Sequence, residues 1–173
     1  MKPTLTLLFQ ICYIVKNNDN TFSFEKAEDS SGFLLWQVTN LWQREIKKAL
    51  EKYGLTHSQY VLMASIHWLT LNNQDVTQIL LSSHTKIDPM TTSTVLRTLQ
   101  TKGLLKRQEH ATDTRAKTVV LTDNGKKIIK QAVKTVEAFD RDFFSTLGPK
   151  TTIFNNQLLS LLQQEGKKVS KLK

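Results

Sequence analysis

The chain has 173 residues, and its 24 lysine and arginine residues against 15 acidic residues give a formal net charge of +9. This length fits one or at most two small domains. A content of 39% hydrophobic residues with only 3 prolines and 6 glycines excludes wholesale disorder and collagen-like repetition. The single cysteine excludes a disulfide framework and an all-thiolate zinc site within one chain. The positive charge favours an anionic partner, which could be nucleic acid, a membrane surface or an acidic protein.

The positive charge is concentrated in one central segment and one short tail. Residues 1–83 contain seven basic and seven acidic residues, and residues 131–163 contain three of each, so both segments sum to zero. Residues 84–130 contain ten basic and four acidic residues, a sum of +6, and residues 164–173 add +3. A basic tail is usually solvated, whereas a basic segment inside a folded region is a better candidate for a binding face.

The first 31 residues are expected to form an N-terminal extension or linker. The apolar run 5–15 is too short for a membrane-spanning helix, which needs about 20 residues, and no small-residue cleavage site follows it. We expect a packed strand or helix, or residues added by an upstream start codon; a signal or anchor is the alternative. Cys12 lies in this run, where apolar neighbours raise the pKa of a thiol. We expect it to be buried or incidental, with redox sensing as the alternative.

Two helices are predicted next. Apolar residues at three- and four-residue spacing over residues 33–53 predict an amphipathic helix, and Gly54 is expected to end it. Thr56 and Gln59 have the spacing of a capping box, which begins a second helix that runs to about Leu71. This second helix is apolar on most sides, so we expect it to be central and buried.

A polar-faced helix follows a short one. Asp75 is expected to cap the short helix. Asp88 and Pro89 form a strong helix start, with Asp88 as the N-cap, and the helix is expected to close at Lys102. Four consecutive hydroxyl residues, 91–94, are unfavourable in a purely structural helix because they compete for backbone hydrogen bonds. They suit a helix that meets a DNA groove; a solvated hydroxyl-rich face is the alternative.

The rest of the chain predicts a hairpin and two helices. Residues 104–108 and 117–121 indicate two strands joined by a charged tip. Thr122 or the residue after it is expected to cap a long helix with a heptad-like apolar seam, which Gly148 and the following proline stop. A last helix begins near Thr151.

The order helix, turn, polar-faced helix, hairpin and long helix is that of a winged helix-turn-helix. The N-terminal residues of such a helix meet base edges in the major groove, and its positive dipole end meets phosphate. An arginine on the hairpin tip can reach the neighbouring minor groove.

Four motifs make residues 33–165 resemble the MarR family of bacterial transcriptional regulators. They are Gly54-Leu55-Thr56, Leu99-x-x-Lys102-Gly103-Leu104-Leu105-x-Arg107, Asp113-x-Arg115-Ala116-Lys117 and Leu121-Thr122-x-x-Gly125. The resemblance implies a mainly α fold, namely a winged helix-turn-helix with N- and C-terminal dimerisation helices and one small β-hairpin wing. It also implies a homodimer whose two winged domains read a pseudo-palindromic site on double-stranded DNA.

The resemblance divides the chain into five parts. They are an N-terminal extension or linker (1–31), an N-terminal dimerisation helix (32–55), a winged helix-turn-helix DNA-binding domain (56–122), C-terminal dimerisation helices (123–166) and a basic tail (167–173).

The resemblance also assigns DNA contacts. Arg115 matches the wing-tip arginine that enters the minor groove, and Asp113 matches the acid that holds the wing in shape; an exposed ion pair of small energetic weight is the alternative. Many members carry a basic residue in the middle of the recognition helix, where this chain has Thr94, so base preferences cannot be carried over. The expected contacts are Thr91, Thr92, Ser93, Thr94 and Arg97 in the major groove, Arg115 in the minor groove, and Lys86, Arg107 and Lys117 at phosphates.

The family often binds small aromatic or anionic effectors between the dimerisation helices and the winged domain. Aromatic side chains that could line such a crevice are Trp36, Trp42, His57, His67 and Trp68. Because aromatic residues at helical spacing are more often core residues, packing is the alternative for each of them. His57 and His67 are ten residues apart, which is not the spacing of a chelating pair, so we expect no metal site.

Nothing in the chain resembles a catalytic set, and Asp140 and Asp142, two residues apart on a predicted helix, are expected at the surface. We therefore expect a cytoplasmic, homodimeric DNA-binding regulator that is not an enzyme, needs no cofactor and does not bind a membrane. It would act as a repressor relieved by a ligand. The alternative is a winged-helix protein-interaction module whose basic face meets an acidic partner or a membrane surface.

Overall fold

The structure is a computed structural model that describes residues 21–109 and 117–163. Its contacts divide the chain into two units, Met1–Asn40 and Leu41–Lys173. The described part of the first unit holds a short 3-10 helix, η2 (Ala27–Asp29), and the start of α2 (Ser31–Glu51). At that start the rings of Phe33 and Trp36 stack with their centroids 6.2 Å apart, and both residues are exposed.

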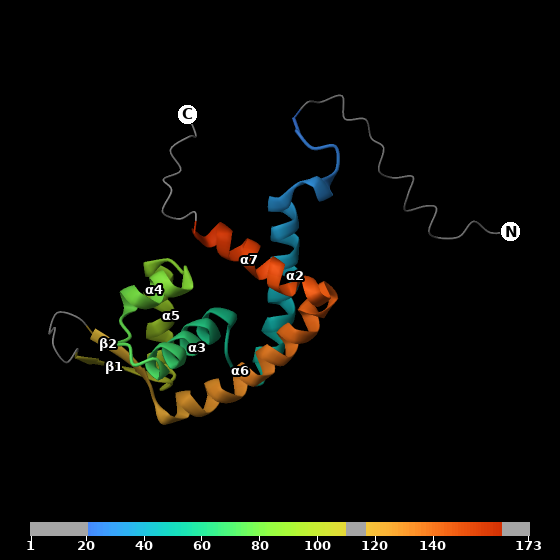
Figure 1. The fold of residues 1–173 in the computed structure, drawn as a ribbon. Coiled ribbons are helices and arrows are strands. Elements are labelled where there is room, and N and C mark those ends of the chain that lie inside the picture. Colours follow the sequence, from blue (N-terminus) through green and yellow to red (C-terminus); the bar gives the residue numbers. More distant parts are fainter. Residues whose placement is uncertain (1–20, 110–116, 164–173) are drawn as a thin grey trace, which may run out of the picture. The chain divides into compact units, whose positions relative to one another are not determined.

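The second unit is mainly helical with one hairpin, as the sequence predicts (Figure 1). After the end of α2 its elements are α3 (His57–Leu71), α4 (Gln78–Thr85), α5 (Pro89–Thr101), β1 (Leu105–Glu109), β2 (Lys117–Leu121), α6 (Asp123–Phe143), the 3-10 segment η3 (Phe144–Lys150) and α7 (Thr151–Leu162). In residues 21–109 and 117–163, no helix combines the length and apolarity needed to cross a membrane.

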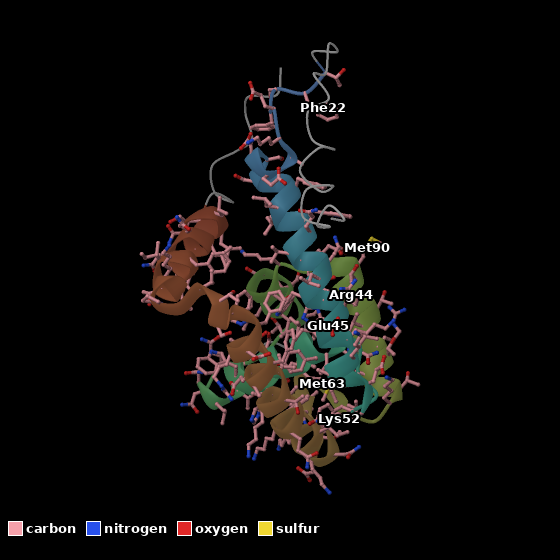
Figure 2. The ribbon with its side chains drawn as sticks, turned by 90° about the vertical axis from the view of Figure 1, so that its right-hand side faces the viewer. Phe22, Arg44, Glu45, Lys52, Met63 and Met90 are labelled. Atoms are coloured by element: carbon pink, nitrogen blue, oxygen red, sulfur yellow. The ribbon has the colours of Figure 1, made fainter. Side chains whose placement is uncertain are left out.

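Helix α3 is the centre of this unit, which confirms the expectation from its apolar sequence. It packs against α4, α5, α6 and β2. Leu62, Met63 and Ile66 are fully buried, and Figure 2 shows Met63 among the helices. The predicted capping box is present, since the Thr56 hydroxyl accepts from the Gln59 backbone N–H while the Gln59 side chain accepts from the Thr56 backbone N–H.

The two strands form an antiparallel hairpin. Leu105 lies opposite Leu121, and Arg107 lies opposite Val119. The Val119 backbone N–H donates to the Val76 carbonyl oxygen at 2.7 Å, so the segment before α4 runs beside β2. This contact joins the hairpin to the helix-turn-helix.

The same contact explains why the predicted start of the short helix is wrong. Because Val76 is extended along β2, the helix cannot begin at Asp75. It begins two residues later, where the Thr77 hydroxyl accepts from the Leu80 backbone N–H at 3.2 Å. Thr77, and not Asp75, is therefore the N-cap of α4.

The end of the long helix also differs from the prediction. Helix α6 ends at Phe143, ahead of Gly148, and η3 continues the chain to α7. The tighter turns of η3 bring the ring of Phe144 within 6.1 Å of the ring of Phe154 in α7. The apolar seam of α6 therefore continues through Phe144 of η3 to Phe154 of α7, and it does not lie within one helix.

Candidate DNA-binding surface

Helix α5 begins at an N-cap that was expected from the sequence. Asp88 Oδ1 accepts a hydrogen bond from the Thr91 backbone N–H at 2.9 Å, and Pro89 follows at the first turn. The hydrogen bonds from Thr91 hold the pKa of the Asp88 carboxyl below its usual value. The start of the helix is exposed, so its side chains are available to a partner.

The inward side of α5 contains one residue that was expected to contact DNA. Thr92 is 0% exposed, and its Oγ1 donates to the Ile87 carbonyl oxygen at 3.3 Å. Leu96 and Leu99 follow on the same side of the helix and are also buried. Thr92 therefore belongs to the core, and its assignment to the major groove is wrong.

The outward side of α5 carries threonines whose hydroxyl groups bond to their own helix. Thr94 Oγ1 donates to the Met90 carbonyl oxygen at 3.0 Å, and Thr98 Oγ1 donates to the Thr94 carbonyl oxygen at 3.1 Å. Thr101 Oγ1 donates to the Arg97 carbonyl oxygen at 3.1 Å. All five residues are exposed, so they form one solvent-facing stripe along the helix, which we call the outward stripe.

Met90 is the member of the outward stripe that sequence reasoning missed. Its side chain is 82% exposed and projects away from the ribbon in Figure 2. The available signal was its place directly after Pro89 at the start of a polar-faced helix. Of the other expected contacts near this surface, Thr91 is exposed and Ser93 is half-buried, while Lys86 is exposed at the end of α4.

The far end of α5 is tied to the start of α3. Lys102 Nζ donates to the Gly54 carbonyl oxygen at 2.9 Å and to Gln59 Oε1 at 3.1 Å. Sequence reasoning placed Lys102 at the end of a helix but missed these contacts, because Lys102 and Gly54 are 48 residues apart. The ammonium group therefore positions α5 against α3.

The hairpin places Arg107 on its inner face. Arg107 lies opposite Val119, which is 1% exposed, and two residues after the buried Leu105. Its Nε and Nη2 are buried and find no hydrogen-bond partner within the part of the chain that the structure describes. This half-buried, inward position does not fit the expected contact with a DNA phosphate.

The tip of the wing lies outside the described residues, and with it Asp113 and Arg115. Lys117 is described only as the first residue of β2, paired in register with Glu109. The assignment of the wing to the minor groove therefore stays a prediction.

Helix α6 begins directly against the segment that follows α5. The Thr122 hydroxyl accepts from the Gly125 backbone N–H at 3.1 Å and donates to the Gly103 carbonyl oxygen at 2.8 Å. The Thr122 backbone N–H donates to the Leu104 carbonyl oxygen at 3.1 Å. A Cβ atom at Gly125 would overlap that same oxygen. The Thr-x-x-Gly spacing thus allows two backbone segments to approach closely.

An aromatic and polar cluster joins α2, α3 and α6. Trp42 Nε1 donates to Asp140 Oδ1 at 2.8 Å, and the ring of Trp42 meets the ring of His57 edge-on at 4.9 Å between centroids. Burial lowers the pKa of His57, and the Asp140 carboxylate opposes this effect. Burial, followed by the charge of Asp140, raises the pKa of Tyr60 to about 12. Two of the five expected crevice residues are thus together.

Asp140 was expected at the surface, and this expectation is wrong. It lies beside the apolar seam of α6, where the indole N–H of Trp42 supplies a hydrogen bond that compensates for its partial burial. Asp140 also lines a cavity of about 540 Å³ between α6, η3 and α7, with Phe144, Phe154 and Leu158 as apolar walls. A cavity of this size can hold a small aromatic molecule.

The other three expected crevice residues lie elsewhere. Trp36 and Trp68 are each 63% exposed, and Trp36 belongs to the first unit. His67 lines a separate cavity of about 390 Å³ together with Lys106 and Lys126. Burial, followed by the charges of Lys130 and Lys126, lowers the pKa of His67.

No metal centre is indicated in residues 21–109 and 117–163, where no three His, Cys, Asp or Glu side chains gather closely enough to hold an ion. Cys12 lies outside the described residues.

The sequence of this fold matches known regulators. The family model described as "ArnR1-like, winged-helix domain" matches residues 51–138, about half of the chain. The chain is 37% identical over 142 residues to the uncharacterized HTH-type transcriptional regulator YdcH of Bacillus subtilis (strain 168), a match that covers 82% of this chain and 96% of that protein. The similar protein is a transcriptional regulator, which implies a function other than enzymatic catalysis.

Solved structures share the fold. CouR from Rhodococcus jostii RHA1, bound to p-coumaroyl-CoA, is 26% identical with a TM-score of 0.68, and the match covers 82% of this chain and 94% of CouR. A mutant of MarR from E. coli in complex with operator DNA is 22% identical with a TM-score of 0.65, and the match covers 76% of this chain and 91% of that one. With its helix-turn-helix, its hairpin and its sequence matches to winged-helix regulators, the chain belongs to the MarR family of winged helix-turn-helix transcriptional regulators.

Proposed function

We propose that the chain is a sequence-specific regulator that acts in the cytoplasm as a homodimer on a pseudo-palindromic operator, and that a small effector relieves its repression. The observation that carries the proposal is α5, whose capped start and outward stripe are both open to solvent. A helix presented in this way fits the major groove of DNA. The operator DNA held by the similar MarR mutant supports the same use of the fold.

In this proposal α5 meets base edges and the wing meets the adjacent minor groove. Asp113 keeps the wing in shape by pairing with Arg115. Arg107 is omitted because its Nε and Nη2 atoms are buried. The proposed contacts are Thr91, Ser93, Thr94 and Arg97 in the major groove, Arg115 in the minor groove, and Lys86 and Lys117 at phosphates.

Helices from both ends of the chain are proposed to form the dimer. They lie in residues 32–55 and 123–166, which precede and follow the DNA-binding domain 56–122 in the sequence. Support comes from α7, on which four large apolar residues are exposed: Ile153, Leu159, Leu161 and Leu162. Exposed apolar patches of this kind mark protein interfaces. Sedimentation should therefore find a dimer, which Leu159→Asp should dissociate. Leu71→Asp is the matched control, since Leu71 is also exposed but lies at the end of α3; it should leave the dimer intact.

The effector is proposed to bind beside Trp42, His57 and Asp140, with the neighbouring cavity taking its bulk. The p-coumaroyl-CoA bound to CouR supports an aromatic or anionic effector. Two recognition helices must lie about 34–36 Å apart to enter successive major grooves. An effector that fits only a dimer with a different spacing would shift the population away from the DNA-binding form.

The decisive experiment compares the affinity of the full chain for duplexes selected from a random pool with its affinity for scrambled duplexes, as a function of salt. We expect a steep salt dependence and a preference for the selected duplex of about 1,000-fold or more that persists at about 150 mM salt. Arg115→Ala should weaken operator binding, and Lys117→Ala should weaken binding to all duplexes and reduce the salt slope by about one. Equal affinity for selected and scrambled duplexes would instead favour a protein-interaction module whose basic face meets an acidic partner or membrane surface.

A further inference from the structure

We propose that Met90 reads the 5-methyl groups of thymines, and that the outward stripe of α5 thereby selects A·T base pairs over G·C pairs. This inference rests on the proposed function, because it requires α5 to enter the major groove. It assigns a base preference to a helix whose outward stripe carries one basic residue, Arg97.

Met90 is an apolar side chain that the protein itself leaves uncovered. Methionine is among the residues most often buried, yet Met90 is 82% exposed. Its backbone is fixed by Pro89 before it and by the N-cap hydrogen bond from Thr91 to Asp88. The side chain therefore stands at a defined place at the start of the helix, the part that meets base edges in this class of motif. Its flexible thioether suits contact with a methyl group.

The threonines of the outward stripe have unusual hydrogen-bonding capacity. A hydroxyl group has one hydrogen to donate, and Thr94, Thr98 and Thr101 each donate it to a carbonyl oxygen four residues earlier. With these hydrogens engaged inside the helix, the side chains offer a partner acceptor oxygens and methyl groups. The stripe therefore presents acceptors and apolar carbon, with Arg97 as its one strong donor.

This surface complements one kind of base pair. In the major groove an A·T pair presents the thymine methyl group, the adenine N6 amino donor and two acceptors, adenine N7 and thymine O4. A G·C pair likewise presents two acceptors, guanine N7 and O6, and one donor, the cytosine N4 amino group, but it has no methyl group. The group that distinguishes the two pairs for an apolar surface is therefore the thymine methyl, which favours A·T pairs opposite Met90 and the threonine methyl groups.

The test replaces each thymine of one half-site with uracil, which removes only the 5-methyl group. The full chain should lose affinity by about fourfold at each thymine that Met90 contacts, as expected for one buried carbon group. Met90→Ala should bind the thymine operator more weakly and should no longer respond to uracil at those positions, so that the two changes are not additive. Met90→Leu, which keeps an apolar side chain, should still respond. The matched control is Leu71→Ala, which removes an exposed apolar side chain from the end of α3 and should respond as the unaltered chain does.

Two results would overturn the inference while leaving the proposed function intact. The first is that replacing thymine with uracil weakens binding of Met90→Ala and of the unaltered chain by the same factor, at every thymine of a specifically bound operator. The other is a set of selected operators with G·C pairs at all positions facing Thr94 and Thr98. A failure to prefer any selected duplex at about 150 mM salt would instead refute the proposed function itself.

Discussion

Replacing Gly125 with alanine has two opposite effects on stability at the start of α6: it raises the helix propensity, and it crowds the packing against Leu104. Propensity alone favours alanine by about 1 kcal/mol. The added Cβ would overlap the Leu104 carbonyl oxygen and lie 3.0 Å from its carbonyl carbon, and no side-chain rotation can move these backbone atoms. Overpacking costs about 1–3 kcal/mol, and displacing Leu104 weakens the hydrogen bond from Thr122, worth about 1 kcal/mol. Because the gain in propensity and the weakened hydrogen bond are of similar size and nearly cancel, the net effect is that of overpacking, a loss of about 1–3 kcal/mol from the free energy of unfolding.

Urea unfolding followed by circular dichroism measures this loss directly. Protein concentration must be held fixed, because association with a second copy changes apparent stability. Gly32→Ala is the matched control, since Gly32 lies in α2 and a Cβ there meets nothing within 4 Å; it should not lower stability. A Gly125→Ala variant as stable as the unaltered chain would refute the argument that close backbone approach requires glycine at this position.

Three further changes test the contacts around the helix-turn-helix. Lys102→Met keeps the apolar stem but removes the ammonium group that joins α5 to α3, so unfolding should cost about 1 kcal/mol less and operator affinity should fall; unchanged values for both would contradict the positioning role. Because burial lowers the pKa of His57, the unfolded state binds a proton more readily, so stability should be fully present above the ordinary histidine pKa of about 6.5 and fall below it. Urea midpoints at several pH values should show this fall, and His57→Gln should reduce it, although His67 shifts in the same direction. Trp42→Phe removes the hydrogen bond to Asp140 and should lower the free energy of unfolding by about 1 kcal/mol, whereas Asp140→Asn, which keeps an acceptor, should lower it less.

Sequence reasoning succeeded where the cause of a structure lies within a few residues. The capping box of Thr56 and Gln59 and the start of α5 at Asp88 and Pro89 each depend on hydrogen bonds or dihedral angles inside one helical turn. The patterns that mark them are therefore complete in the local sequence.

It failed where a distant segment decides the outcome. Asp75 has the chemistry of an N-cap, but the β-bridge between Thr77 and Thr118, with its hydrogen bond from Val119 to Val76, keeps the chain extended until Thr77. Thr92 resembles its hydroxyl neighbours in sequence, and only the positions of Leu96 and Leu99 on the same side show that it faces the core.

The candidate effector crevice shows the same limit. Trp42 and Asp140 are 98 residues apart, and their hydrogen bond depends on how α2 meets α6. Trp68 is also a tryptophan and directly follows His67, another expected crevice residue, yet its side chain is exposed to solvent. The sequence supplied the candidate aromatic residues, and tertiary packing decided that Trp42 meets Asp140 while Trp68 stays exposed.

The bonds of Thr122 have a mechanical consequence. The Thr122 hydroxyl and the Thr122 backbone N–H link the first turn of α6 to the carbonyl oxygens of Gly103 and Leu104, which directly follow α5. At the same end of α5, Lys102 links the chain to α3. A rotation of α6 would therefore act on the end of α5 through hydrogen bonds between residues that are adjacent to both helices. A signal that turns α6 by a small angle should thus reorient α5 without touching it.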